Sequence, residues 1–294
     1  MKKQLFYGAA TALITPFKEN GELDIKGLEH LIEFQIEGNI QALILSGTTG
    51  EGSTLSFDEF SLLLAEANRI IRHRVPLIAG TGSNNTATAL KLSLEAKKRG
   101  ANGILLVTPY YNKTTQEGLL QHYFTIADRV DLPMLVYNVP SRTGMSIVPE
   151  TCRLLSQHPR IIGVKEASGN IGAIADIASK CPSFDIYSGN DDQIIPILSL
   201  GGVGVISVLS NIAPREVQRI CQLYADKQIE KATQEQLRFI PLIRLLFSQV
   251  NPIPIKCAAQ IMNLPAGEPR LPLIPCDETL KNELEIAMKD AGLI

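Results

Sequence analysis

A single lysine interrupts a run of residues that otherwise has the composition of a buried strand. Lys165 follows the apolar residues 161–164, where an ammonium group is costly to bury. Burial lowers the pKa of lysine, and a fall from ~10.4 to about 7 would make around half of the amine neutral at pH 7. Such an amine predicts Schiff-base chemistry on a carbonyl substrate. An ion pair with Glu166, or a side chain that reaches water, is the alternative.

Paired threonines follow another apolar run, in the segment GTTGEGST at residues 47–54. The segment is similar to a phosphate-binding loop, but Ser53 stands where that loop requires a lysine. Its glycines and the hydroxyl groups of Thr48 and Thr49 suit a small carboxylate. A plain turn between a strand and a helix is an equally good interpretation, although it would not need two threonines.

Three of the seven tyrosines and one arginine lie at or just beyond the ends of two further predicted strands. Tyr110 and Tyr111 lie in TPYYNK, and Tyr137 and Arg142 lie in YNVPSRTG. Tyrosines at strand ends usually pack as aromatic side chains, but three of them together favour a proton relay. Arg142 is either solvated or offers a bidentate contact to a substrate carboxylate.

Charge and residue usage restrict the class of partner. A net charge of -2 and the absence of a Lys/Arg run argue against nucleic acid or a membrane, so a small molecule is expected. Five cysteines without a C-x-x-C pair predict neither disulfides nor a zinc site and favour a reducing cytoplasm. No metal and no cofactor are predicted, because the four histidines fall in helical segments where surface or capping roles are expected: His30, His73, His122 and His158.

Short apolar runs alternate with segments of helical spacing along most of the chain. Eight such runs are present, and their continuous apolarity predicts parallel strands that are covered on both faces. We therefore expect an α/β fold, a (β/α)8 TIM barrel; the competing open doubly wound sheet would place G-x-G-x-x-G after the first run, which is absent. The runs begin at residues 8, 42, 76, 103, 133, 161, 185 and 202.

Helix signals set the expected boundaries. Asp24, Ser56, Thr86 and Thr115 precede helical segments as N-caps, and Ser56 with Glu59 has the spacing of a capping box. After the last run only helical spacing and Pro-rich turns remain. This predicts a catalytic barrel over residues 1–227 and a C-terminal helical domain over residues 228–294. Active sites of such barrels form where the strands end, so the residues that close each run are expected to meet there.

Six motifs of the chain together resemble the dihydrodipicolinate synthases, also called 4-hydroxy-tetrahydrodipicolinate synthases. The resemblance covers essentially the whole chain. It implies condensation of pyruvate with aspartate 4-semialdehyde, the first committed step towards diaminopimelate and lysine. The motifs are GTTGE at 47–51, TPYYNK at 108–113, YNVPSRTG at 137–144, GVKEASG at 163–169, SGND at 188–191 and NPIPIK at 251–256.

The resemblance also implies roles for individual residues. Lys165 matches the Schiff-base lysine, and Tyr137, Thr49 and Tyr111 match the proton relay, with Tyr111 borrowed from a neighbouring subunit. A homotetramer built from two tight dimers follows as the expected assembly. The residues expected to bind substrate are Thr48 at the pyruvate carboxylate, Arg142 at the semialdehyde carboxylate, Ile206 through its backbone, and Gly189 with Asn190.

Three positions depart from the family pattern. Asn190 stands where many members carry an aspartate, so a role that depends on charge is in doubt there. Phe60 and Thr88 replace a histidine and a glutamate of the lysine-binding pocket, although Asn84 and Tyr110 are retained. We therefore expect weak or absent inhibition by lysine.

Alternative functions for the chain come mainly from related enzymes of the same superfamily. N-acetylneuraminate lyase and the 2-keto-3-deoxy sugar acid aldolases share the lysine and the tyrosine, but generally lack an arginine at the position of Arg142. That arginine and the doubled Thr48 and Thr49 favour the synthase. A barrel with a binding role and no turnover is the alternative from another class.

Overall fold

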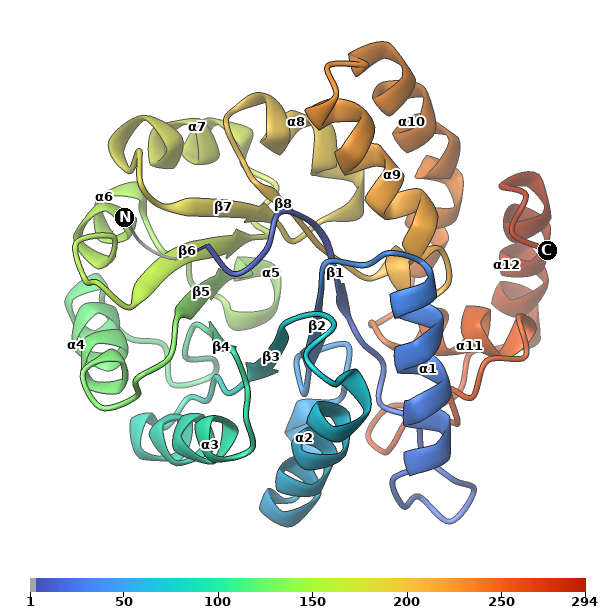
Figure 1. Cartoon of the computed structure of the whole chain (residues 1–294), viewed down its shortest axis with the longest axis horizontal. Coiled ribbons are helices and arrows are strands. Elements are labelled where there is room, and N and C mark those ends of the chain that lie inside the picture. The colour runs from blue at the N-terminus through green and yellow to red at the C-terminus, as the bar shows by residue number, and fades with distance from the viewer. Residues whose placement is uncertain (1–3) are drawn as a thin grey trace.

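The computed structural model describes residues 4–294. Within them, eight parallel strands pair in chain order and close into a barrel (Figure 1). Every strand lies inside one of the predicted runs, so the (β/α)8 fold is confirmed. The strands are β1 (Gly8–Ala12), β2 (Ala42–Leu45), β3 (Leu77–Gly80), β4 (Gly103–Val107), β5 (Met134–Asn138), β6 (Ile161–Glu166), β7 (Asp185–Ser188) and β8 (Gly204–Ser207).

Helices follow the strands and surround them (Figure 1). The longer ones are α1 (Ile25–Glu37), α2 (Phe57–Ile71), α3 (Thr86–Lys98), α4 (Gln116–Ala127), α6 (Pro149–Leu155), α7 (Ile171–Lys180), α8 (Ile194–Ser199) and α9 (Pro214–Ala225). Short helical turns lie in the loops after four of the strands: η1 (Gly52–Thr54), α5 (Pro140–Thr143), η2 (Asp191–Gln193) and η3 (Leu209–Asn211).

The predicted helix starts are largely as expected. Asp24 and Thr115 accept backbone hydrogen bonds as N-caps of α1 and α4, and Ser56 forms a reciprocal capping box with Glu59 at α2. The prediction for α3 was wrong by one residue, because its N-cap is Asn85, whose side-chain carbonyl oxygen accepts hydrogen bonds from two backbone N–H groups.

Three helices follow the barrel. They are α10 (Ile229–Leu246), α11 (Ile253–Ile261) and α12 (Glu278–Asp290), and they gather at one side of the molecule beside α9 and α1 (Figure 1). Their positions agree with the helical extension expected for residues 228–294, and the division into two domains at residue 227 stays a prediction. None of the helices within residues 4–294 is long and apolar enough to cross a membrane.

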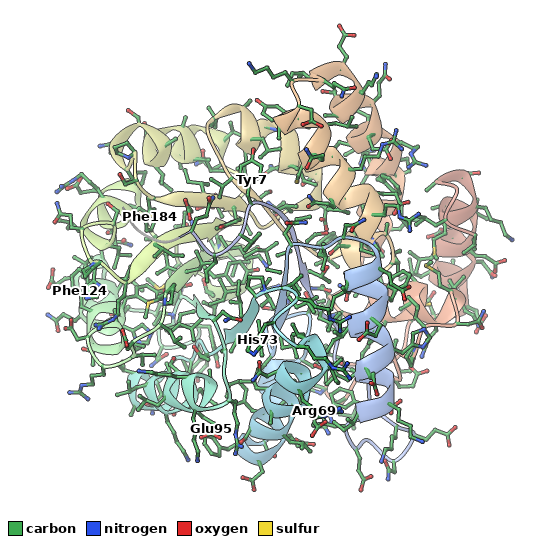
Figure 2. All side chains as sticks on the ribbon, viewed as in Figure 1. Tyr7, Arg69, His73, Glu95, Phe124 and Phe184 are labelled. Carbon is green, nitrogen blue, oxygen red and sulfur yellow. The ribbon has the colours of Figure 1, made fainter. Side chains whose placement is uncertain are left out.

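Apolar side chains form two core layers. The outer layer lies between the strands and the helices, and the inner layer fills the barrel itself. Figure 2 shows side chains both within the ring of strands and between the strands and the helices. Along β5, Leu135 and Tyr137 belong to the inner layer whereas Met134 and Val136 belong to the outer one. This alternation decides which residues of each strand face the interior.

A bulge at the start of β6 changes the direction of its side chains. Met134 of β5 pairs with Ile161, but Leu135 pairs with Gly163, so β6 carries one extra residue. Ile161 faces outward, so strict alternation along the strand would also turn the side chain of Lys165 outward. The extra residue shifts the alternation by one, and Lys165 therefore faces the barrel interior. A Cβ on Gly163 would lie 2.3 Å from the carbonyl oxygen of Asp185, so only glycine fits at this point.

Candidate active site

A cavity of about 650 Å³ opens at the carboxyl ends of the strands. Its wall contains five of the predicted site residues, which come from β5, β6 and the loops after β2 and β5. They are Thr48, Thr49, Tyr137, Arg142 and Lys165. The wall also includes the predicted lysine-pocket positions Phe60, Thr88 and Tyr110, and residues that follow α10, namely Val250 and Asn251.

Lys165 lies inside the barrel between two tyrosines. It pairs in register with Tyr137 on β5 and with Tyr187 on β7, so the three side chains share the inner face. Lys165 as a residue is 5% exposed, and its Nζ lies 4.4 Å from the centre of the Tyr137 ring. A Cβ on Gly189 would come within 3.1 Å of Lys165 Cε, so glycine at that position leaves room for the lysine.

Burial lowers the pKa of Lys165 to about 8. The negative charge of Asp191 opposes this shift, and the positive charge of Arg142 adds to it. With this pKa roughly a tenth of the amine is neutral at pH 7, against ~0.04% for an ordinary lysine. The shift has the predicted direction but is smaller than the predicted fall to about 7, since Asp191 stabilises the ammonium form.

Tyr137 keeps its proton at neutral pH. Burial raises the pKa of its phenol to about 12, while Arg142 lowers the pKa and Glu166 raises it. A protonated phenol next to the amine can donate a proton to a reacting oxygen and recover it afterwards.

Glu166 does not pair with Lys165, so that alternative was wrong. The carboxylate accepts hydrogen bonds from Asn138 Nδ2 and from the backbone N–H of Ser168, both at 2.8 Å. Adjacent residues of a strand point to opposite faces, so Glu166 lies outside the barrel interior that holds the lysine. Its pKa is raised by burial.

Asp191 is a buried carboxylate that the sequence interpretation missed. Its Oδ2 accepts from the backbone N–H groups of Val208 and Leu209, each at 3.0 Å, and burial raises its pKa. The signal available in the sequence was the acidic residue that closes the seventh run, in the motif SGND. Its charge acts on Lys165 and counters the effect of Arg142.

The threonine loop is held by residues after α10. These residues lie in the motif NPIPIK, but the sequence analysis assigned them no role. Asn251 Nδ2 donates to Thr49 Oγ1 at 2.9 Å. Glu51, with a left-handed backbone at φ 51°, forms a buried ion pair at 2.6 Å with Lys256 of α11. A lysine inside the apolar segment IPIKCAAQI was the available signal for this pair.

Arg142 lies on the short helix α5 with its side chain exposed at the mouth of the cavity. Its Nη2 donates to the carbonyl oxygen of Asn251 at 3.4 Å. The rest of its guanidinium fork is available to a carboxylate, which it can hold through two parallel hydrogen bonds.

Four predicted site residues do not line this cavity in the described chain. Tyr111 is 93% exposed with a left-handed backbone at φ 68°, and Ile206 packs in the inner core layer. Asn190 donates through Nδ2 to Gln193 Oε1 at 3.3 Å. Gly189 lies next to the side chain of Lys165. The roles expected for these residues stay predictions.

The histidines lie away from the cavity, as expected, but one is not at the surface. His122 on α4 is buried, and its Nδ1 lies 2.9 Å from Thr86 Oγ1. Burial lowers its pKa to about 4, so the ring is neutral and packs against Tyr123. Among residues 4–294 no cluster of three His, Cys, Asp or Glu side chains could hold a metal ion.

These features define the class of the protein: a (β/α)8 barrel with a buried, partly neutral lysine that faces a cavity lined by tyrosine, threonine and arginine. The model of the dihydrodipicolinate synthetase family matches residues 5–291. The chain belongs to this family, which confirms the resemblance predicted from its motifs.

Individual relatives align with this chain over nearly the whole length of both chains. A 4-hydroxy-tetrahydrodipicolinate synthase of Caldicellulosiruptor saccharolyticus is 50% identical over 289 residues, which are 98% of each chain. The solved dihydrodipicolinate synthase of Thermotoga maritima has a TM-score of 0.97 at 43% identity and covers 99% of this chain and 100% of its own. A solved monomeric dihydrodipicolinate synthase variant has a TM-score of 0.96 at 43% identity. The match covers 99% of this chain and 98% of that one.

Proposed function

We propose that the protein condenses pyruvate with L-aspartate 4-semialdehyde to give 4-hydroxy-tetrahydrodipicolinate, in lysine and diaminopimelate biosynthesis. The observation that carries this proposal is Lys165, buried beside Tyr137 at a cavity wall with its pKa lowered to about 8. A partly neutral amine in that position suits attack on a keto acid. The names of the full-length relatives favour these two substrates.

The proposed reaction begins at the lysine. Lys165 Nζ attacks the ketone carbon of pyruvate, water leaves, and a protonated imine forms. Loss of a methyl proton gives an enamine, whose carbon attacks the aldehyde of the second substrate and forms the new C–C bond. The amino group of the adduct then displaces the lysine as the ring closes, which frees Nζ for another cycle.

The neighbouring residues would move protons and hold the substrates. Tyr137 would protonate the oxygens that leave or develop charge, in relay with Thr49 and with Tyr111 of a neighbouring subunit. Thr48 and the amides of its turn would hold the pyruvate carboxylate. Arg142 would hold that of the semialdehyde, with Gly189, Asn190 and the Ile206 backbone as further contacts. No cofactor takes part in this scheme.

We also propose a homotetramer built from two tight dimers, in the cytoplasm. Exposed Tyr111 supports the assembly, because a left-handed backbone holds its ring in solvent outside its own cavity. Five free cysteines, four of them buried, support a reducing compartment.

Borohydride reduction in the presence of pyruvate tests the function. We expect one covalent adduct per chain by intact mass, none in Lys165→Ala, and an unchanged adduct in the exposed control Lys281→Ala. A coupled assay should then show turnover with aspartate 4-semialdehyde and not with N-acetylmannosamine. A wild-type protein that forms no adduct, or that prefers the sugar, would contradict the proposal.

A further inference from the structure

A buried carboxylate ends the turn that would hold the carboxylate of pyruvate. Glu51 donates through its backbone N–H to the carbonyl oxygen of Thr48 at 3.1 Å, which closes the turn. Within residues 4–294 the N–H groups of Thr48, Thr49 and Gly50 donate no hydrogen bond, and consecutive free amides of this kind attract an anion. Glu51 is 2% exposed and belongs to the cavity wall, so its own negative charge acts on the same anion.

Lys256 of α11 supplies the compensating charge. Its Nζ lies 2.6 Å from Glu51 Oε1, and both side chains are 1% exposed, so solvent and salt screen the pair very little. The ammonium also donates to the carbonyl oxygen of Glu268 at 3.1 Å and lies 4.4 Å from the centre of the Phe17 ring. The second carboxylate oxygen of Glu51, Oε2, accepts from the backbone N–H of Arg270 at 2.8 Å. Both oxygens of the carboxylate are therefore held by the C-terminal part of the chain.

We propose that Lys256 is a positioning residue for pyruvate, which acts through Glu51. It fixes the carboxylate that ends the threonine turn, and it cancels the negative charge that would otherwise repel the carboxylate of the substrate. This role rests on the function proposed above, because it concerns the binding of pyruvate to that turn. The buried pair then affects substrate affinity as well as the stability of the fold.

A charge effect and a purely structural effect predict different results for the two partners of the pair. If the pair only held the turn in shape, loss of either partner would weaken pyruvate binding to a similar extent. If the charge matters, loss of Lys256 leaves an uncompensated carboxylate beside the anionic substrate, whereas loss of Glu51 leaves a cation there. Unit charges that share a partly screened site change a binding constant by about tenfold or more. The sign of the remaining charge therefore distinguishes the two effects.

Lys256→Met, Glu51→Gln and the double variant test this role. We expect Lys256→Met to raise KM for pyruvate, and the pyruvate concentration that half-saturates borohydride trapping, by about tenfold, with kcat within about threefold of wild type. Glu51→Gln should leave KM for pyruvate within about twofold of wild type or lower it, and the double variant should return it to within about threefold, since no uncompensated charge remains. Lys281→Met, at an exposed pair, is the control and should keep the wild-type values.

The outcomes separate this role from the proposed function. If wild-type protein forms no pyruvate adduct, the proposed function fails. If wild-type protein condenses the two substrates but Lys256→Met keeps its KM for pyruvate, or Glu51→Gln raises KM as much as Lys256→Met does, only the role of Lys256 is overturned. Should Lys256→Met not fold, Lys256→Gln decides, because it keeps a hydrogen-bond donor but removes the charge: a raised KM for pyruvate supports the role, and an unchanged KM refutes it.

Discussion

Two neighbours of opposite charge set the reactivity of Lys165. Burial lowers the pKa of the amine and Arg142 lowers it further, whereas Asp191 raises it. The balance leaves the pKa at about 8, so part of the amine is neutral at physiological pH and the rest can hold a proton. An iminium formed on this lysine would be a buried cation, and the buried carboxylate of Asp191 supplies the opposite charge.

The pH dependence of adduct formation follows from this pKa. The neutral fraction of Lys165 rises about tenfold between pH 7 and pH 9, so the trapping rate at low pyruvate should rise by that factor and then level off. Asp191→Asn removes the charge that raises the pKa and should move the midpoint to lower pH. Time-resolved intact mass measures both rates. A midpoint near the ordinary lysine value of ~10.4 would contradict the role of burial.

Inhibition by lysine should be weak or absent. Phe60 is buried and Thr88 is exposed, and both line the cavity without offering a carboxylate to an ammonium group. Lys91 also lines it, with Nζ 4.1 Å from the centre of the Phe57 ring, and would repel a bound lysine. We expect little change in turnover at millimolar lysine and a gain of sensitivity in Thr88→Glu; half-inhibition of the wild type in that range would refute this.

At the scale of elements, the C-terminal helices hold the loop that follows β2. Lys256 of α11 pairs with Glu51 and also donates to the backbone oxygen of Glu268 at 3.1 Å. Arg270 donates through its backbone to Glu51 at 2.8 Å and pairs through its guanidinium with Glu59 of α2. The loop that carries Thr48 and Thr49 is thereby tied to residues more than two hundred positions away.

Breaking this buried pair should be costly. Lys256→Met leaves the Glu51 carboxylate buried without its cation, so we expect the free energy of unfolding in urea to fall by about 3–5 kcal/mol. The double variant Glu51→Gln with Lys256→Met removes both charges and should recover part of the loss. Lys281→Met, at an exposed pair with Glu278, is the matched control and should cost less than about 1 kcal/mol. Equal effects at the buried and exposed sites would refute the assignment.

At the scale of the whole molecule, the cavity of one chain lacks a member of the predicted relay. Tyr111 is held outward by its left-handed backbone, next to Tyr110, which does line the cavity. A second copy of the chain could bring its own Tyr111 to this cavity by a two-fold axis, since such an interface is reciprocal. Activity would then depend on assembly.

Complementation between inactive variants tests this dependence. Lys165→Ala and Tyr111→Phe should each show little turnover alone. If each site takes Tyr111 from the other subunit of a dimer, equal mixing after dissociation should restore about a quarter of wild-type activity, because half the dimers are mixed and each has one intact site. Activity that stays at the sum of the separate variants would show that the sites do not share Tyr111.

The sequence by itself determined the eight strands, the helical extension and five of the residues that line the cavity. Buried parallel strands need continuous apolar runs, and barrel geometry brings the ends of those runs together, so Lys165, Tyr137, Thr49 and Arg142 were predictable from order alone. These signals are local in the chain, and no distant contact is needed to read them.

Only the tertiary structure decided how the lysine is oriented and what surrounds it. The bulge before Gly163 turns Lys165 inward, and a strand pattern without its partner cannot reveal a shift of one residue. The charge of Asp191 and the contacts from Asn251 and Lys256 depend on residues brought together by folding, which no periodicity encodes. Electrostatic effects and hydrogen bonds depend on distance in space, so the pKa of the lysine and the anchoring of the threonine loop appear only in the folded chain.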